Sequence, residues 1–311
     1  MIRQNSPVAL FCAPQPIAIV ENETGLGKDT LRVWEKRYGF PTPERDAQGE
    51  RLYAPAQIER LLHIKRALDA GMRPGQVVPL SLPELQARLN DHHPIDHHPE
   101  TEALWPLVVA GHANALAQAL TMTQQRMGWV AFVNECVAPL NVRVGQAWLN
   151  GEIEIHQEHV YAETLQTFLR QSIAQLKQQG PLQAPKVLLT TLNNEQHSLG
   201  LLMVELMLVL VRCDTLSLGT RLPMEHVMAA TRMHQPDVVA LSFSSHYGSR
   251  EAWRDAQTLR SHLPEPVALW VGGAALNAPK RSPKLKGVQR MASLSDLHTA
   301  AQVWRQTQVR T

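Results

Sequence analysis

The sequence predicts a multidomain protein of the α + α/β class. We expect a helix-rich block first, a helical middle, and last a doubly wound parallel sheet of the Rossmann or flavodoxin type. Three observations support this order. Short apolar segments alternate with helical patterns after Gly180, as in parallel sheets. Apolar residues recur at helical spacing between residues 101 and 179. The polar, proline-containing stretch 91–100 separates the two helical regions and indicates a linker.

Composition indicates the class of protein and the boundaries of its domains. A chain of 311 residues, 44% hydrophobic and 19% charged, is typical of a globular protein with two or three domains. The four histidines of the linker lack a rigid frame, which favours a linker over a metal site. The net charge of +2 neither requires nor excludes a nucleic-acid partner. We expect a flexible N-terminus at 1–15, a compact block at 16–88, a linker at 89–100, a helical block at 101–180 and a sheet domain at 181–311.

Cysteine usage and hydropathy indicate a cytoplasmic protein. The 3 cysteines, Cys12, Cys136 and Cys213, are scattered without the spacing of a metal site or a disulfide framework. The longest apolar run, residues 199–211, contains Glu205 and is shorter than the roughly 20 residues that cross a bilayer. We therefore expect no contact with a membrane.

The C-terminal region places candidate ligand-binding residues at strand ends. Apolar runs predict buried strands at 186–191, 238–242 and 267–271. In parallel sheets ligands bind beyond the carboxyl ends of the strands. Residues with useful chemistry lie at or just past the ends of these three strands: His197, Ser242 and Gly272 with Gly273.

These residues suit a bulky metal-containing ligand. A neutral imidazole such as His197 can bind a metal ion, and Glu195 can orient it and raise its basicity. Ser242 can donate a hydrogen bond. Glycines let the backbone approach a ligand closely, because they have no Cβ. The glycines concerned are Gly200, Gly272 and Gly273.

The spacing of these residues resembles the cobalamin-binding module of methionine synthase and its relatives. Glu195-x-His197-x-x-Gly200 is followed after 41 residues by Ser242-x-Ser244, and after 27 more by the glycine pair. The resemblance implies that His197 is the lower axial ligand of cobalt and that Ser242 contacts the nucleotide base of the cofactor. Two positions depart from the usual pattern: Glu195 replaces Asp, and Ser244 replaces Thr or Leu.

The N-terminal block, over residues 16–80, resembles the DNA-binding domain of the MerR family. The motifs are Thr30-Leu-Arg-Val-Trp-Glu-Lys-Arg-Tyr-Gly39, Pro43-x-Arg45 and Gly49-Glu-Arg-Leu-Tyr53. Gly25 marks a turn between two helices, and the second, at 28–38, would enter the major groove of DNA. Trp34 is interpreted as core. The resemblance implies a winged helix-turn-helix whose DNA contacts come from Lys28, Thr30, Arg32, Arg37, Arg45, Arg51 and Tyr53.

The middle block resembles light-sensing, cobalamin-dependent repressors of the CarH/LitR type. Trp148 is followed after nine residues by Glu158 and His159, as in that family. The family joins a MerR-like domain, a four-helix bundle and a cobalamin domain in this order. Trp148 would pack over the adenosyl group of adenosylcobalamin, Glu158 would hydrogen-bond it, and His159 would shape the pocket or an oligomer contact. Some members have a His after the Trp that can bind cobalt after photolysis. Leu149 stands there, which puts a two-histidine product in doubt.

The resemblance implies a regulator, not an enzyme. We expect a light-responsive repressor that binds double-stranded operator DNA in the dark as an adenosylcobalamin-bound homo-oligomer, by resemblance a tetramer. Photolysis of the Co–carbon bond would release it from DNA. Two alternatives stay open at this point. One is a MerR-type regulator whose sheet domain binds another ligand or none. The other is a corrinoid-carrying methyltransferase subunit.

Overall fold

A computed structural model describes residues 13–69, 72–92, 98–149, 152–193, 195–245, 247–276 and 285–308. The chain forms two compact units, Met1–His112 with Glu135–Val160 and Ala113–Asn134 with Tyr161–Thr311. Most of the N-terminus expected to be flexible, and residues 93–97 of the expected linker, lie outside the described ranges. Across those ranges, no helix is long and apolar enough to cross a membrane.

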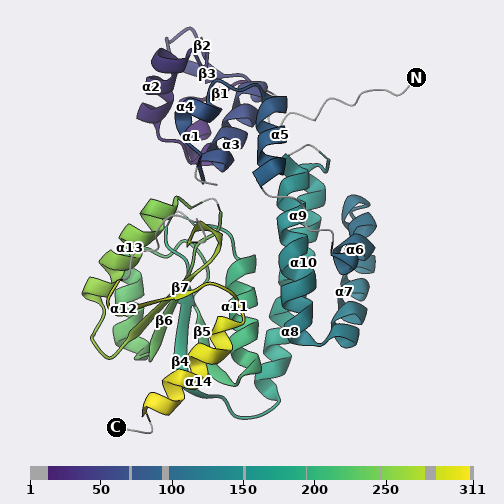
Figure 1. Ribbon diagram of the computed structural model, residues 1–311, viewed down its shortest axis with the longest axis vertical. Helices are drawn as coiled ribbons and strands as arrows, with labels where there is room; N and C mark the ends of the chain where they lie inside the picture. Colours follow the sequence, from purple (N-terminus) through teal and green to yellow (C-terminus); the bar gives the residue numbers. More distant parts are fainter. Residues whose placement is uncertain are drawn as a thin grey trace. The chain divides into compact units, whose positions relative to one another are not determined.

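The N-terminal domain is a small helical fold with a three-stranded sheet (Figure 1). Its first helix ends at Gly25, whose backbone is left-handed with φ 66°, and the Gly25 N–H bonds to the carbonyl of Glu21. The second helix begins and ends where the sequence predicts. The antiparallel sheet has the order β1–β3–β2. The elements are β1 (Gln15–Pro16), α1 (Ile17–Thr24), α2 (Lys28–Tyr38), β2 (Glu44–Arg45), β3 (Arg51–Tyr53), α3 (Pro55–Asp69), α4 (Pro74–Val77) and α5 (Leu82–His92).

Packing in this domain confirms one prediction and corrects one boundary. Trp34 is 5% exposed and lies in the core, as predicted. The last helix, α5, runs to His92, past the predicted boundary at 88 and into the predicted linker. Leu85 and Leu89 are both buried one turn apart, so the packed face of α5 extends to the boundary, and polar residues continue the helix beyond it.

The described chain between the linker and the sheet domain is helical, as predicted. A π-helical turn, which the sequence did not predict, interrupts one long helical run between α8 and α9. Near it, the rings of Trp129, Phe132 and Phe168 cluster with centroids 5.7–6.2 Å apart. The elements are α6 (Pro99–Val109), α7 (Ala113–Met127), α8 (Trp129–Ala131), η1 (Phe132–Val137), α9 (Ala138–Leu149) and α10 (Ile155–Gln178).

The C-terminal domain is a parallel five-stranded sheet of the order β5–β4–β6–β7–β8. From β4 the chain moves outward to β5, and it then returns to β6 on the other side of β4. The carboxyl ends of β4 and β6 therefore flank the point where the winding direction reverses, which is where open parallel sheets bind ligands. The elements are β4 (Gln183–Thr190), α11 (Leu199–Leu210), β5 (Cys213–Ser217), α12 (Met224–His234), β6 (Val238–Ser242), α13 (Ser249–His262), β7 (Ala268–Gly272), η2 (Ala274–Leu276), β8 (Val288–Met291) and α14 (Asp296–Gln308).

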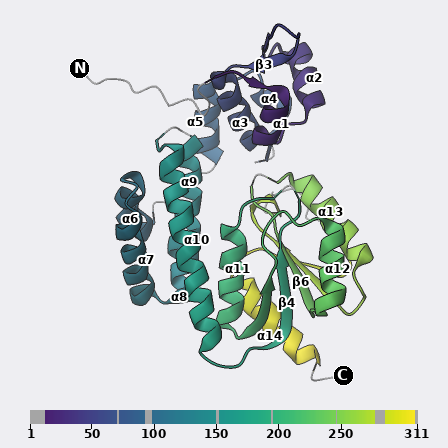
Figure 2. The ribbon, with the colours of Figure 1, turned by 180° about the vertical axis from the view of Figure 1, so that it is seen from behind.

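Helices cover both faces of this sheet. Figures 1 and 2 show α12 and α13 on one face and α11 and α14 on the other. Alternate strand residues such as Leu188, Val239 and Leu269 pack in one core cluster with Val227 of α12 and Leu259 of α13. The doubly wound architecture predicted from the sequence is confirmed.

The sequence predicted the three central strands but not the two edge strands. β6 has the predicted bounds, and β4 and β7 differ from their predictions by one to three residues at each end. The edge strands β5 and β8 carry polar residues such as Asp214 and Gln289, because one long side of an edge strand is not paired. Their apolar signal is therefore too weak to recognise.

Candidate functional site

The loop after β4 carries Glu195 and His197 and is anchored by neighbouring segments. The hydroxyl of Thr191 donates to the carbonyl of Glu195 at 2.6 Å. The N–H of Arg221, in the loop after β5, donates to the same carbonyl at 3.2 Å. Arg221 has a left-handed backbone with φ 62°, which is uncommon for a residue with a side chain. The loop is thus fixed from two sides.

One carboxylate joins the two loops that flank the switch point. Glu195 is 1% exposed. Its Oε1 accepts hydrogen bonds from the backbone N–H and from Nδ1 of His197, at 2.9 and 2.6 Å. Its Oε2 accepts one from the backbone N–H of Ser244, just after β6, at 2.6 Å. The hydroxyl of Ser244 also lies 3.1 Å from Nδ1 of His197. The structure therefore brings Glu195, His197 and Ser244 together.

The electrostatics of this group suit metal binding by the imidazole. Burial alone raises the pKa of Glu195, but the hydrogen bonds and charge of His197, with the hydrogen bond from Ser244, outweigh burial and bring that pKa below its ordinary value. Glu195 is thus ionised at neutral pH and can accept the Nδ1 proton. A carboxylate on Nδ1 fixes the tautomer in which Nε2 carries the lone pair. The side chain of His197 is 40% exposed, which makes the ring accessible from outside.

The remaining parts of the motif meet at the same edge. Ser242 at the end of β6 is the register partner of Gly272 in β7. A Cβ on Gly200 would lie 3.1 Å from the hydroxyl of Ser242, so glycine lets the first turn of α11 approach β6. A Cβ on Gly273 would lie 2.1 Å from the carbonyl oxygen of Phe243, so only glycine fits there. The glycines thus serve close packing of backbone around Ser242.

A metal held here would take most of its ligands from outside the protein. In the part of the chain that the structure describes, no group of three or more His, Cys, Asp or Glu side chains could hold a metal ion. His197 is the oriented donor at this edge. A single imidazole suits a metal already held by a macrocycle, which needs only an axial ligand. These residues therefore fit a corrinoid.

Trp148, Glu158 and His159 lie in the other compact unit. Trp148 is half-buried near the end of α9, and Glu158 lies in the first turn of α10. The Nδ1 atom of His159 is 2.7 Å from Oε2 of Glu158, and the side chain of His159 is 71% exposed. An acid in the first helical turn is also favoured by the helix dipole. The cofactor roles of these three residues stay predictions.

The second candidate site lies on α2 and the wing, which is the β2–β3 hairpin. Arg32, Arg37 and Arg45 are exposed, whereas Lys28 and Thr30 are half-buried. Arg32 pairs with Asp29 at 3.1 Å across one turn of α2. Further cationic contacts are Lys28 with Glu21 at 3.4 Å and Arg37 over the Tyr38 ring at 5.3 Å.

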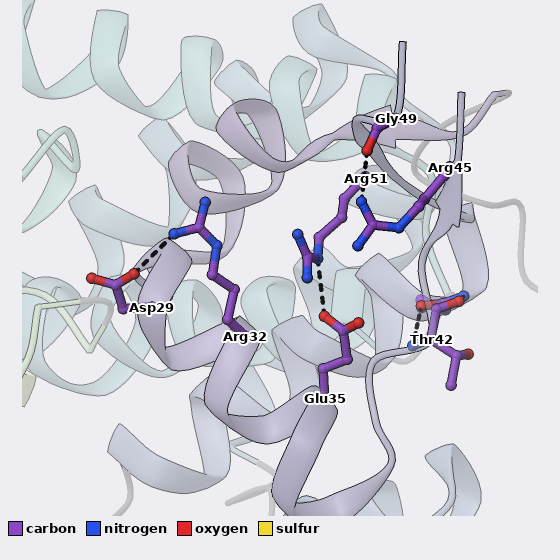
Figure 3. A network of polar contacts seen from close by, with 8 residues as sticks. Asp29, Arg32, Glu35, Thr42, Arg45, Gly49 and Arg51 are labelled. Carbon is purple, nitrogen blue, oxygen red and sulfur yellow. Dashed lines mark hydrogen bonds and ion pairs between the residues drawn. The ribbon is translucent and has the colours of Figure 1, made fainter. Parts of the chain in front are cut away.

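The wing places two arginines opposite each other. Arg45 and Arg51 are cross-strand partners in β2 and β3. Arg45 donates to the carbonyl of Gly49 in the wing turn at 2.7 Å, and Arg51 donates from Nε to Glu35 of α2 at 2.9 Å (Figure 3). Like charges directly opposite in a sheet are destabilising, so an anion bound between them would relieve the repulsion. This is consistent with a phosphate-binding role.

Tyr53 requires a correction. The sequence placed it with Arg51 as an exposed contact of the wing, but the structure buries it completely in the core of the domain. It lies where β3 leaves the wing and pairs with Gln15 of β1. Burial raises the pKa of its hydroxyl, which has no hydrogen-bond partner among the described residues. Tyr53 is not proposed further as a DNA contact.

Sequence reasoning missed three residues that position these sites. Thr191 and Arg221 hold the Glu195 loop, and Glu35 holds Arg51. No sequence motif indicates Thr191 or Arg221. They meet only because the loops after β4 and β5 lie side by side in the folded protein. Glu35 lies inside the recognised motif, and its place one turn after Arg32 on the same helix was the available signal.

Comparison with known sequences assigns a family to each of two regions. Residues 16–80 match the family described as MerR HTH family regulatory protein, and residues 101–171 match the B12 binding domain. The chain is 30% identical over 273 residues to the HTH-type transcriptional repressor CarH of Myxococcus xanthus, covering 83% of this chain and 88% of that one. It is 28% identical over 299 residues to the repressor CarA of the same organism, covering 93% and 96%.

Comparison with solved structures supports the fold. The monomethylamine corrinoid protein of Methanosarcina barkeri matches with a TM-score of 0.51 and 15% identity, covering 65% of this chain and 96% of that one. At this identity the likeness shows a shared architecture only.

Proposed function

Since this chain belongs to the family of MerR-type transcriptional regulators with a B12-binding domain that includes CarH and CarA, we propose that it is a repressor controlled by adenosylcobalamin and light. The family assignment makes the chain a cobalamin-binding transcriptional regulator. The named relatives that span most of it are repressors and not enzymes. This argues against the alternative of a corrinoid-carrying methyltransferase subunit.

The observation that carries the proposal is the Glu195–His197 pair at the switch point of the sheet. Nε2 of His197 would bind the cobalt, while Glu195 and Ser244 orient the ring through Nδ1. The seam of Gly200, Ser242 and Gly272 would receive the nucleotide tail, with Ser242 as a hydrogen-bond donor. When bound, adenosylcobalamin supplies the light chemistry, because its Co–carbon bond is itself photolabile.

The helical middle of the chain would respond to the presence or absence of the adenosyl group on the cofactor. The resemblance to CarH/LitR-type repressors implies that Trp148 would pack on the adenosyl group and that Glu158 would hydrogen-bond it. His159 would border the same region or a subunit contact. A residue that touches only the adenosyl group can stabilise only the state that contains it. We propose that these contacts favour the dark, DNA-binding assembly.

Assembly would raise affinity for DNA. An oligomer, by resemblance a tetramer, presents several copies of α2 to adjacent half-sites on one duplex. Once one copy is bound, the next binds at a high effective concentration, so avidity increases without new contacts. Loss of the assembly in light would therefore weaken DNA binding.

One experiment tests the proposal as a whole. The purified protein is mixed with adenosylcobalamin in the dark, its absorbance spectrum is recorded, and its binding to DNA upstream of its own gene is measured before and after illumination. A bound, light-sensitive spectrum with binding lost in light supports the proposal. A protein that binds this DNA but takes up no cobalamin would instead support a regulator with another ligand or none.

Replacing Trp148 by Ala is expected to impair dark assembly. Truncating a fully buried Trp costs about 3–5 kcal/mol. Trp148 is half-buried, so we expect a smaller loss, from the surface that would face the adenosyl group. Sedimentation of both proteins with adenosylcobalamin in the dark should show a smaller species for the variant. Trp304→Ala, which truncates a half-buried Trp on α14, is the matched control and should assemble normally. Normal assembly of Trp148→Ala would contradict its assigned role.

Replacing Arg51 by Ala is expected to weaken DNA binding about equally on specific and random duplexes. A phosphate contact carries no sequence information, and its loss should lower the slope of log affinity against log salt concentration by about 1. Titrations at several salt concentrations measure both quantities. If the affinity and the salt slope of Arg51→Ala equal those of the wild type, Arg51 does not contact DNA.

A further inference from the structure

We propose that Glu35 on α2 is a positioning residue that holds the Arg51 guanidinium in place for a DNA phosphate. The inference rests on the DNA binding described above. It concerns an acidic side chain on the helix expected to enter the major groove, where a negative charge would otherwise oppose binding.

The geometry of the pair is specific. Nε of Arg51 donates to Oε2 of Glu35 at 2.9 Å, and the two side chains are 24% and 31% exposed. Figure 3 shows this contact bridging from α2 to the wing. Glu35 engages Nε, so the terminal Nη groups of the same planar fork can bind a phosphate. The hydrogen bond from Arg51 to Glu35 is also the largest cause that raises the pKa of Arg51 above its ordinary value.

The two arginines of the wing make an acidic partner for Arg51 favourable. Arg45 and Arg51 are cross-strand partners in β2 and β3, a pairing of like charges that is unfavourable in itself. Arg45 is held by the carbonyl of Gly49 within the wing turn. Arg51 is held from the other side by Glu35. Each guanidinium group of this cross-strand pair is thereby held by its own hydrogen-bond partner.

An acid near DNA has a cost that must be offset. Glu35 adds a negative charge close to the phosphate backbone, and this charge alone weakens binding. Asp29, six residues earlier on the same helix, has the same charge but is 94% exposed and pairs with Arg32 across a single turn. Such an exposed pair orders its partner weakly. Asp29 is therefore a control for charge without positioning.

The experiment is a double-mutant cycle on DNA binding. Glu35→Ala is made in the wild-type protein and in the Arg51→Ala background, with Asp29→Asn and Glu35→Gln alongside. Affinity is measured for the duplex upstream of the protein's own gene and for a random duplex of equal length. All positions are at least partly exposed, and circular dichroism confirms folding of each variant.

We expect Glu35→Ala to change DNA affinity in opposite directions in the presence and in the absence of Arg51. Glu35→Ala should weaken binding to both duplexes about twofold to fivefold, the range of a positioned ion pair of this exposure, although it removes a negative charge. Glu35→Gln, which keeps an acceptor oxygen, should retain part of the affinity. In the Arg51→Ala background, Glu35→Ala should tighten binding, and Asp29→Asn should do the same in the wild type.

Two outcomes would overturn the proposal. If Glu35→Ala tightens binding in the wild type, Glu35 is only an unfavourable charge. If it weakens binding equally in both backgrounds, Glu35 acts without Arg51, for example on a base. Failure of the wild type to prefer the upstream duplex would count against the proposed repressor function, and the cycle on the random duplex would still decide the role of Glu35.

Discussion

His197→Ala is expected to remove the imidazole-bound features from the absorbance spectrum of bound adenosylcobalamin and to weaken its binding. The imidazole is the oriented donor at the switch point, and a small apolar side chain cannot replace it at cobalt. The side chain is 40% exposed, so its removal leaves the packing of the sheet domain intact. Equilibrium binding and dark spectra of both proteins measure the effect.

Glu195→Gln provides the matched comparison. It keeps the size of the side chain but removes the charge that fixes the Nδ1 proton. Loss of an orienting acid typically lowers metal affinity by about 10–100-fold, so this variant should weaken binding while the imidazole spectrum persists. If His197→Ala binds with unchanged affinity and spectrum, the lower ligand lies elsewhere.

Lys177→Met is expected to destabilise the sheet domain by about 3–5 kcal/mol. Lys177 at the end of α10 donates to Glu205 of α11 at 2.8 Å and to the carbonyl of Thr215 at 3.1 Å. Glu205 is 6% exposed, and Thr215 is its other hydrogen-bond donor at 3.2 Å. Removing the cation leaves a buried carboxylate without its ion pair.

The double variant Lys177→Met with Glu205→Leu separates the ion pair from general packing. Replacing both partners by apolar groups of similar volume is often neutral, so this protein should recover most of the lost stability. Hydrogen–deuterium exchange of the β4 and β5 amides measures the free energy of opening in this domain. If Lys177→Met is as stable as the wild type, then solvent, and not Lys177, stabilises the charge of the Glu205 carboxylate.

The sequence was sufficient where a signal is local or strongly apolar. Residues 238–242 form a central strand, and all but the last are buried. Because they are buried they form an unbroken apolar run, which could be recognised in the sequence. The spacing from His197 to Gly272 placed the candidate residues at or just beyond the ends of strands β4, β6 and β7, which are neighbours in the sheet.

What could not be predicted depends on contacts between segments. The Arg51–Glu35 pair joins residues 16 apart, and the N–H of Arg221 reaches the Glu195 loop from the loop after β5, a strand that the sequence did not reveal. Tyr53 was misplaced because an aromatic residue on a short strand suits either a surface contact or a core. Its burial is decided by β1, which is only two residues long.

The anchoring of the Glu195 loop has a consequence for conformational entropy. Fixing the backbone of one residue costs about 1–2 kcal/mol. In this loop the ordering occurs during folding, through Thr191 and Arg221, before any ligand arrives. If His197 binds the cofactor as proposed, binding would begin from a rigid imidazole and lose little further freedom. Affinity would then depend on how firmly the edge strand β5 stays paired with β4, because the loop that carries Arg221 follows β5.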